Sequence, residues 1–194
     1  FASRDIYASL GDDAPAESVF LLEPYARNTA GAVTLGALFA AERFGGDVPL
    51  LVMPADHLIR RVDDFSRAAL RAADVARKGY LVAFGVRPTH PETGFGYIEC
   101  GNALDDASPP AQTIARFVEK PPLADAERFL LGGAHVWNAG IFCFTADVLF
   151  EALAMHAPDV LDAARSAWRA RQSSAQSAIE FDAASFARMP DISF

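Results

Sequence analysis

Residues 48–59 read VPLLVMPADHLI, an apolar run that stops at Pro54 and is followed at once by Asp56 and His57. A short apolar run that ends in a turn signal is typical of a buried strand. Two ionisable side chains therefore stand at the end of a strand. Because ligands of open α/β sheets bind beyond the carboxyl ends of the strands, this stretch indicates both the fold class and the edge of the sheet where a site is expected.

Strand-like and helical segments alternate around this stretch. Strand-like runs cover 18–22, 48–53 and 80–86, and helical periodicity covers 28–45 and 63–79. Asn28 is a good helix N-cap, and glycines follow the last periodic residue of both helical segments. The resulting order β-α-β-α-β is typical of a parallel sheet with crossover helices.

The pattern changes after Val86. A loop rich in Pro and Gly leads into a strand, and a second strand at 112–120 follows, so we expect antiparallel or mixed pairing here. A short helix at 124–133, a strand at 135–144 and a helix capped by Thr145 come next, and the Ala-rich remainder beyond Pro158 is expected to be helical. We expect one α/β domain over residues 1–194, with a mixed, mostly parallel sheet flanked by helices.

Composition narrows the function classes. The chain has 194 residues, 52% of them hydrophobic, a net charge of −8 and no basic stretch. This balance argues against nucleic acid or an anionic membrane as partner, so a phosphate ligand would be held by a few placed groups and a metal ion. Two cysteines without CxxC spacing favour a reducing cytoplasm, and no apolar run approaches the roughly 20 residues of a membrane span.

The segment EPYARNTAG at 23–31 is the first candidate ligand site. It places a carboxylate, Glu23, and a rigid Pro24 before Arg27, Asn28 and Thr29 at a helix start. A helix N-terminus offers unpaired N–H groups and a positive dipole end, which suit a phosphate or a polar ring. The carboxylate could accept the two adjacent N–H donors of guanine, which adenine lacks. A capped surface helix is the alternative.

Asp56 is the candidate metal ligand. Mg²⁺ prefers hard oxygen donors and is typically held by one or two carboxylates plus substrate phosphates. His57 is a poor Mg²⁺ ligand and is expected to support the loop. The alternative is that Asp56 caps the turn after the strand.

Three later motifs carry further candidates. PETGFGYIE has glycines that let backbone amides approach a ligand closely, among them Gly96. FVEKPP ends a strand with Glu119 and Lys120, which face opposite ways unless the strand bends at Pro121. HVWNAGIF places a polar Asn138 in an apolar strand. Simple turns and an exposed charge pair are the alternatives.

Five motifs, taken in order and spacing, resemble one family, the bacterial mannose-1-phosphate guanylyltransferases. The motifs are LLEPYARNTAGAV (21–33), LLVMPADHLI (50–59), FGVRPTHPETGFGYIE (84–99), RFVEKP (116–121) and VWNAGIFCF (136–144). The resemblance implies a Rossmann-like nucleotidyltransferase fold and the reaction of GTP with mannose 1-phosphate to give GDP-mannose and pyrophosphate.

The resemblance also implies roles for individual residues. Guanine would be contacted by Glu23, Pro24 and Asn28, with Arg27 and Thr29 completing the nucleotide-binding segment. Asp56 would hold the catalytic Mg²⁺ and Lys120 would bind the sugar phosphate, which makes these two the expected catalytic residues. The mannose pocket would be lined by Gly96, Glu119 and Asn138.

The sequence departs from the family at several points. Gly31 stands where the family usually has Pro, and neither the family's Gly-rich phosphate loop nor its second metal-binding Asp is found. We therefore expect the central part of a catalytic domain, inactive alone. Another sugar-1-phosphate nucleotidyltransferase and a non-catalytic sugar-nucleotide-binding subunit stay open as alternatives, and a homo-oligomer is compatible with the sequence.

Overall fold

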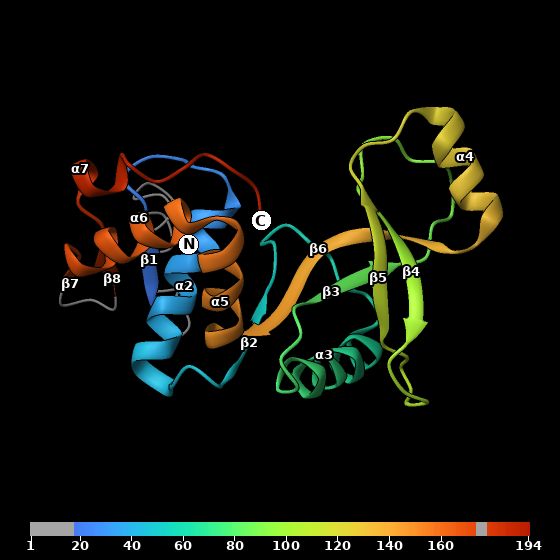
Figure 1. The fold of residues 1–194 in the computed structure, drawn as a ribbon, viewed down its shortest axis with the longest axis horizontal. Helices are drawn as coiled ribbons and strands as arrows, with labels where there is room; N and C mark the ends of the chain where they lie inside the picture. The colour runs from blue at the N-terminus through green and yellow to red at the C-terminus, as the bar shows by residue number, and fades with distance from the viewer. Residues whose placement is uncertain (1–17, 174–177) are drawn as a thin grey trace. The chain divides into compact units, whose positions relative to one another are not determined.

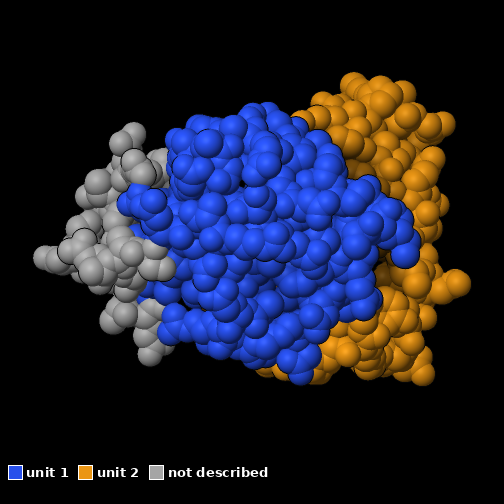
Figure 2. Space-filling view, turned by 60° about the vertical axis from the view of Figure 1, so that its left-hand side comes forward, with its two compact units in different colours: residues 1–48, 145–194 blue, residues 49–144 orange. Residues whose placement is uncertain are grey.

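The computed structural model of the chain describes residues 18–173 and 178–194. The chain divides into two compact units, which Figure 2 shows in separate colours. The first unit takes its residues from 1–48 and 145–194, and the second is the continuous stretch 49–144. Two such units can belong to one folding domain, so the single domain expected from the sequence stays a prediction.

The first unit combines a small sheet with helices around a shared core (Figure 1). Its elements are β1 (Phe20–Leu22), α2 (Thr29–Phe44), α5 (Ala146–His156), α6 (Pro158–Arg169), β7 (Gln172–Ser173), β8 (Ala178–Glu180) and α7 (Ala183–Phe186). The strand order is β1-β8-β7, and β1 runs parallel to β8. Helices α2, α5 and α6 contact one another, and α7 contacts α6.

Helix α2 forms where the sequence predicts it. The Asn28 side chain accepts a hydrogen bond from the Thr29 N–H, and Gly45 ends the helix with a φ of 99° that favours glycine. Its inward face is apolar, with Leu35 fully buried. The core around it consists of Leu21, Leu35, Ala163, Ala164, Ala167, Trp168, Phe181, Phe186 and Met189.

The expected helix beyond Pro158 is correct only as far as Arg169. The chain then forms β7 and β8, and β8 pairs with β1 through Phe20 opposite Ala178 and Leu21 opposite Ile179. The helical propensity of an Ala-rich segment is a weak preference. Pairing with a strand far back in the chain overrides it here.

The second unit is built on a five-stranded sheet. Its elements are β2 (Pro49–Val52), α3 (Val62–Ala76), β3 (Val82–Val86), β4 (Tyr97–Ala103), β5 (Gln112–Val118), α4 (Leu123–Gly132) and β6 (His135–Thr145). The strand order is β2-β6-β4-β5, and β3 also pairs with β6. Figure 1 shows β6 as the long strand that joins these pairings.

The α/β class is as expected, but the strand directions differ from a mostly parallel sheet. β3 and β4 both pair antiparallel with β6, and β4 pairs antiparallel with β5. The strands β1, β2 and β3 are not neighbours, because β1 lies in the other sheet and β6 pairs with both β2 and β3. Local periodicity predicts each strand, whereas the late strand β6 decides their partners.

Two helices bury the sheet of the second unit. α4 packs Phe129 and Ala126 with Tyr97 and Trp137, and Tyr97 is fully buried. Burying a large apolar side chain such as that of Phe129 contributes roughly 2 kcal/mol or more. The other helix, α3, packs its small face of alanines against β3 and Cys143. These two clusters hold β3, β4 and β6 in place, and the predicted sugar-binding residues stand on or next to these strands.

Candidate functional site

The predicted nucleotide-binding residues form one continuous segment in the first unit. Glu23 follows directly on β1, and Asn28 caps α2, so residues 23–29 connect the strand to the helix. The Arg27 guanidinium lies 5.4 Å from the centre of the Tyr25 ring. The strand and the helix, both anchored in the core, thus fix the two ends of the segment.

Glu23 is half-buried, and its Oε1 atom is buried without a hydrogen-bond partner in the part of the chain that the structure describes. Burial raises the pKa of this carboxyl, because desolvation penalises the charged form. An unpaired buried acceptor costs free energy until a donor reaches it. The Glu23 carboxylate therefore has a free acceptor oxygen that could accept a hydrogen bond from an N–H group of a ligand.

The backbone donors at the start of α2 are already used. The Asn28 N–H donates to Asp191 Oδ1 at 2.8 Å, and the Ala30 N–H donates to the carbonyl of Ile192 at 3.2 Å. The Thr29 N–H donates to the Asn28 side chain at 3.0 Å. A carboxylate at this end of a helix stabilises it by about 0.3–1 kcal/mol. These three N–H groups are therefore satisfied, which leaves the side chains of the segment to contact a ligand.

The predicted sugar-binding residues come together in the second unit from three strands. Gly96 precedes β4, Glu119 follows β5 and Asn138 lies in β6. The Asn138 N–H donates to the Gly96 carbonyl at 2.8 Å, and a Cβ atom on Gly96 would lie 2.8 Å from Glu119 Oε2. Only glycine fits at position 96 without a shift of its neighbours. The Asn138 side chain also accepts a hydrogen bond from the Gly140 N–H at 3.1 Å. Asn138 therefore also stabilises a local turn, which was the alternative interpretation of this residue.

The chain bends at Lys120, shortly after β5. The side chains of Glu119 and Lys120 can face the same side of the strand only if the chain bends in this way. Its φ is 44°, in the left-handed region that non-glycine residues rarely adopt, and its N–H donates to the Phe95 carbonyl at 3.2 Å. Lys120 Nζ lies 3.6 Å from Glu119 Oε1. The bend falls on Lys120 itself, before the buried Pro121, and presents a cation and an acceptor together.

Asp56 lies in the turn after β2 and is exposed. Its carboxylate forms no hydrogen bond or ion pair with the residues at 18–173 and 178–194, so a turn cap made by this side chain is not seen. No group of three His, Cys, Asp or Glu side chains within those ranges is placed to hold a metal ion. Pro54 lies against Gly140, where a Cβ would be 3.6 Å from its Cγ. A carboxylate without a partner among the described residues is chemically able to serve as one oxygen ligand of Mg²⁺.

Two residues near these groups were not predicted. The half-exposed Phe117 ring lies against Gly96, with its Cζ 2.6 Å from where a Cβ would stand. Its position one residue before Val118 and two before Glu119 was the available signal, since alternate residues of a strand share a face. Asp191 carries no such signal, because its partner Asn28 is 163 residues away.

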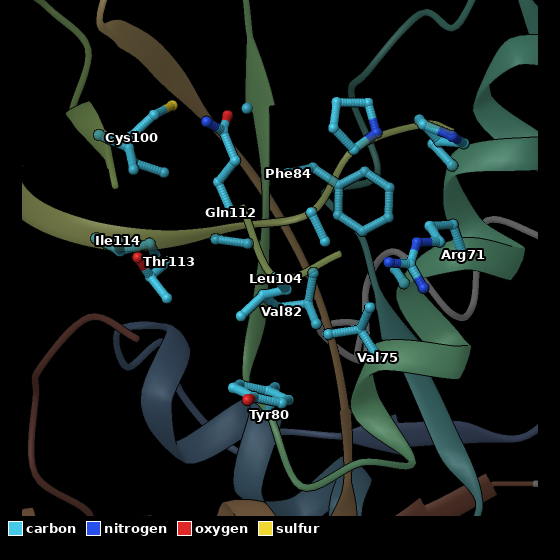
Figure 3. A pocket seen from close by; sticks show the side chains of 18 of the residues that line it. Arg71, Val75, Tyr80, Val82, Phe84, Cys100, Leu104, Gln112, Thr113 and Ile114 are labelled. Atoms are coloured by element: carbon cyan, nitrogen blue, oxygen red, sulfur yellow. The ribbon is translucent and has the colours of Figure 1, made fainter. Parts of the chain in front are cut away.

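A cavity of about 570 Å³ lies elsewhere in the second unit, between α3, β3 and the β4–β5 hairpin (Figure 3). Val75, Val82 and Phe84 form its apolar wall, and Arg71 stands at one side, where it is paired with Asp105. The lining residues that the structure describes include none of the predicted site residues. The cavity is therefore not part of the predicted site.

Comparison with known sequences gives a family match over most of the chain. The family model described as nucleotidyl transferase matches residues 5–182. A xanthan biosynthesis protein XanB of Xanthomonas campestris is 47% identical over 151 residues, which cover 78% of this chain and 31% of that protein. A mannose-1-phosphate guanylyltransferase of Sinorhizobium fredii is 42% identical over 176 residues, which cover 91% of this chain and 34% of that protein. The chain thus spans about a third of the length of these curated relatives.

Solved structures give the same fold. A Thermus thermophilus protein named mannose-1-phosphate geranyltransferase matches with a TM-score of 0.82 and 33% identity, over 99% of this chain and 52% of that one. A Helicobacter pylori protein named mannose-6-phosphate isomerase matches with a TM-score of 0.83 and 32% identity, over 99% of this chain and 73% of that one. The expected nucleotidyltransferase fold is confirmed. The match of the nucleotidyl transferase family model over residues 5–182, which is most of the chain, shows that the chain belongs to that family.

Proposed function

We propose that the protein that carries this chain transfers a guanylyl group from GTP to mannose 1-phosphate, giving GDP-mannose and pyrophosphate. The observation that carries the proposal is the cluster of Gly96, Glu119, Lys120 and Asn138, which strands β4, β5 and β6 bring together. The name mannose-1-phosphate guanylyltransferase, borne by relatives at 39–45% identity, supports the choice of substrates.

The proposed reaction needs little covalent help from the protein. An oxygen of the sugar phosphate attacks the α-phosphorus of GTP, a new P–O bond forms, and the bond from the α-phosphorus to the bridging oxygen breaks as pyrophosphate leaves. The attacking phosphate is already an anion, so no general base is required, and alignment and charge neutralisation supply the rate. In this proposal Lys120 binds the sugar phosphate, and Glu119 and Asn138 accept from and donate to sugar hydroxyls.

Mg²⁺ is part of the proposal, with Asp56 as its carboxylate ligand. When bound, the ion would neutralise the charge of the phosphates. The support from this chain is the exposed Asp56 carboxylate, which has no partner among the described residues and follows the strand next to β6.

Guanine recognition is assigned to residues 23–29. Glu23 would accept the two adjacent N–H donors of guanine, and binding would supply the partner that its buried Oε1 atom lacks. Pro24 would lie against the base. The Oδ1 atom of Asn28 is used by the Thr29 N–H, so its Nδ2 atom is the one that would donate to the ligand.

The setting of the protein completes the proposal. We place it in the cytoplasm, with GTP and mannose 1-phosphate as its partners and without nucleic acid or membrane partners, and a homo-oligomer is compatible with its sequence. Among the residues that the structure describes, no helix combines the length and the apolar composition that a membrane crossing demands.

Assays of the purified protein with GTP, ATP or UTP and with mannose 1-phosphate or glucose 1-phosphate test the proposal. GDP-mannose should form fastest with GTP and mannose 1-phosphate. Preference for another pair would favour a related sugar-1-phosphate nucleotidyltransferase, and binding without turnover would favour a non-catalytic sugar-nucleotide-binding subunit.

Asp56→Ala tests the metal assignment in the same assay. We expect a large fall in kcat/KM, equivalent to the loss of several kcal/mol of transition-state stabilisation, which is the rough scale of a metal's contribution. The melting temperature should not change, because Asp56 is exposed. His57→Gln, at the neighbouring exposed position, is the matched control and should retain most activity. Near-normal turnover of Asp56→Ala would remove Asp56 from the metal site.

A further inference from the structure

Residues 183–194, here called the strap, run along the proposed guanine-binding segment of the first unit and are hydrogen-bonded to it at both ends. At one end the Tyr25 hydroxyl donates to the Ala183 carbonyl at 2.7 Å. At the other end Asp191 Oδ1 accepts from the Asn28 N–H at 2.8 Å. Three further hydrogen bonds join the strap to this segment and to the first turn of α2. They run from Arg27 Nη2 to the Ala187 carbonyl (3.2 Å), from the Ala30 N–H to the Ile192 carbonyl (3.2 Å) and from the Phe194 N–H to Thr29 Oγ1 (2.8 Å).

The strap is anchored in the core. Phe186 is fully buried and Met189 is 2% exposed, and both belong to the cluster that also contains Leu35 of α2. The Tyr25 ring packs edge-on against Phe186, with 5.5 Å between ring centres. The acceptors that the strap offers therefore stand at fixed positions.

Position 31 fits the strap closely. A Cβ atom on Gly31 would lie 2.6 Å from Met189 Cγ and 2.9 Å from its Sδ, so any larger residue would displace Met189. Gly31 is the residue that departs from the Pro usual in the resembled family. In this chain Gly31 and Met189 form a matched pair that lets the strap approach the first turn of α2.

We propose that the strap positions the guanine-binding segment, and that Asp191 is the positioning residue that fixes Asn28. Asn28 has an extended backbone (φ −68°, ψ 176°), and its N–H is held by Asp191 while its side chain caps Thr29. Without the Asp191 carboxylate the Asn28 N–H loses its partner, and the residue that would present Nδ2 to the base is freer to rotate. The inference rests on the proposed function of residues 23–29.

Three variants of the protein that carries this chain test the inference. Asp191→Ala removes the acceptor, Asp191→Asn keeps an acceptor oxygen without the charge, and Ser193→Ala is a matched control at an exposed strap position. We expect Asp191→Ala to raise the KM for GTP about tenfold, the scale of one hydrogen bond with a charged partner, with kcat and the KM for mannose 1-phosphate little changed. Asp191→Asn should recover most of the loss, and Ser193→Ala should match the wild type.

Tyr25→Phe gives a second test if Asp191→Ala does not fold. It removes only the hydroxyl that donates to Ala183, and should raise the KM for GTP while the melting temperature moves by about 2–4 °C at most. An active Asp191→Ala or Tyr25→Phe protein with lowered stability and an unchanged KM for GTP would overturn the inference and leave the proposed function intact.

A wild-type protein without guanylyl transfer would instead overturn the proposed function. In that case amide hydrogen exchange tests the role of the strap without an activity assay. The Asn28 N–H should exchange faster in Asp191→Ala than in the wild type or in Ser193→Ala. Equal exchange rates in all three proteins would overturn the role of Asp191 independently of any activity.

Discussion

Glu23 and Glu119 have similar sequence contexts but different surroundings in the fold. Each follows directly on a strand and is closely followed by proline. The Glu23 carboxyl is half-buried with Oε1 unpaired among the described residues, whereas the Glu119 side chain is 58% exposed and lies 3.6 Å from Lys120 Nζ. The difference teaches that a strand-end glutamate acquires its chemistry from what covers it.

The largest effect that the comparison predicts is at Glu23. Glu23→Gln places an amide where the donors of guanine would bind, so we expect kcat/KM for GTP to fall about 10- to 100-fold, the scale of a charge-assisted hydrogen bond in a buried site. The rates with ATP should change little. Steady-state kinetics with both nucleotides measure this, and equal losses for both would contradict a base-reading role.

Gly96→Ala is expected to have the next largest effect, on the sugar side. Its Cβ would meet the ends of the Phe117 and Glu119 side chains, so both side chains would have to move away from their present positions. We expect a raised KM for mannose 1-phosphate and an unchanged KM for GTP. Gly132→Ala is the control, because a Cβ there meets nothing within 4 Å. An unchanged KM for mannose 1-phosphate in Gly96→Ala would separate Gly96 from the sugar pocket.

The pH dependence sharpens the contrast. The raised pKa of Glu23 means that the folded state favours its protonated form, so its contribution to stability is present at low pH and is lost as the pH rises through that pKa. Glu23→Gln should therefore melt higher than the wild type at pH 7 and equally at acidic pH. The affinity for GTP should fall on acidification in the wild type and stay flat in Glu23→Gln, as titration calorimetry can measure.

Glu119→Gln should have the smallest effect. The exposed ion pair with Lys120 contributes at most about 1 kcal/mol, and glutamine keeps an acceptor oxygen for a sugar hydroxyl. We expect less than about a fivefold change in kcat/KM for mannose 1-phosphate. A loss as large as that of Glu23→Gln would show that the two carboxylates are equivalent after all.

Sequence reasoning reached the features that local chemistry decides. The cap at Asn28, the stop at Gly45 and the cap at Thr145 were predicted because each signal lies within a few residues of the helix end that it sets. Gly96, Glu119 and Asn138 were singled out because their motifs resemble those of a known family, and the structure brings the three residues close together. Their role in binding a sugar stays a prediction.

The features that depend on distant partners were not reached. β8 is three residues long and shows no periodicity, and its partner β1 lies about 158 positions earlier in the chain. The bend at Lys120 requires a positive φ, which sequence analysis usually expects only at glycine, so this bend could not be predicted. The directions of the strands followed β6, whose place between β2 and β4 no local pattern records.

The pairing of β1 with β8 has a consequence for the order in which the protein matures. A chain emerges from the ribosome from its N-terminus at about 5–20 residues per second, so Glu23 is made long before Ala178, Met189 and Asp191. The whole of residues 49–144 is synthesised between the two parts of the first unit. β1 and Asn28 therefore obtain their contacts with β8 and Asp191 only after the whole of residues 49–144 has been made and residue 191 has been translated.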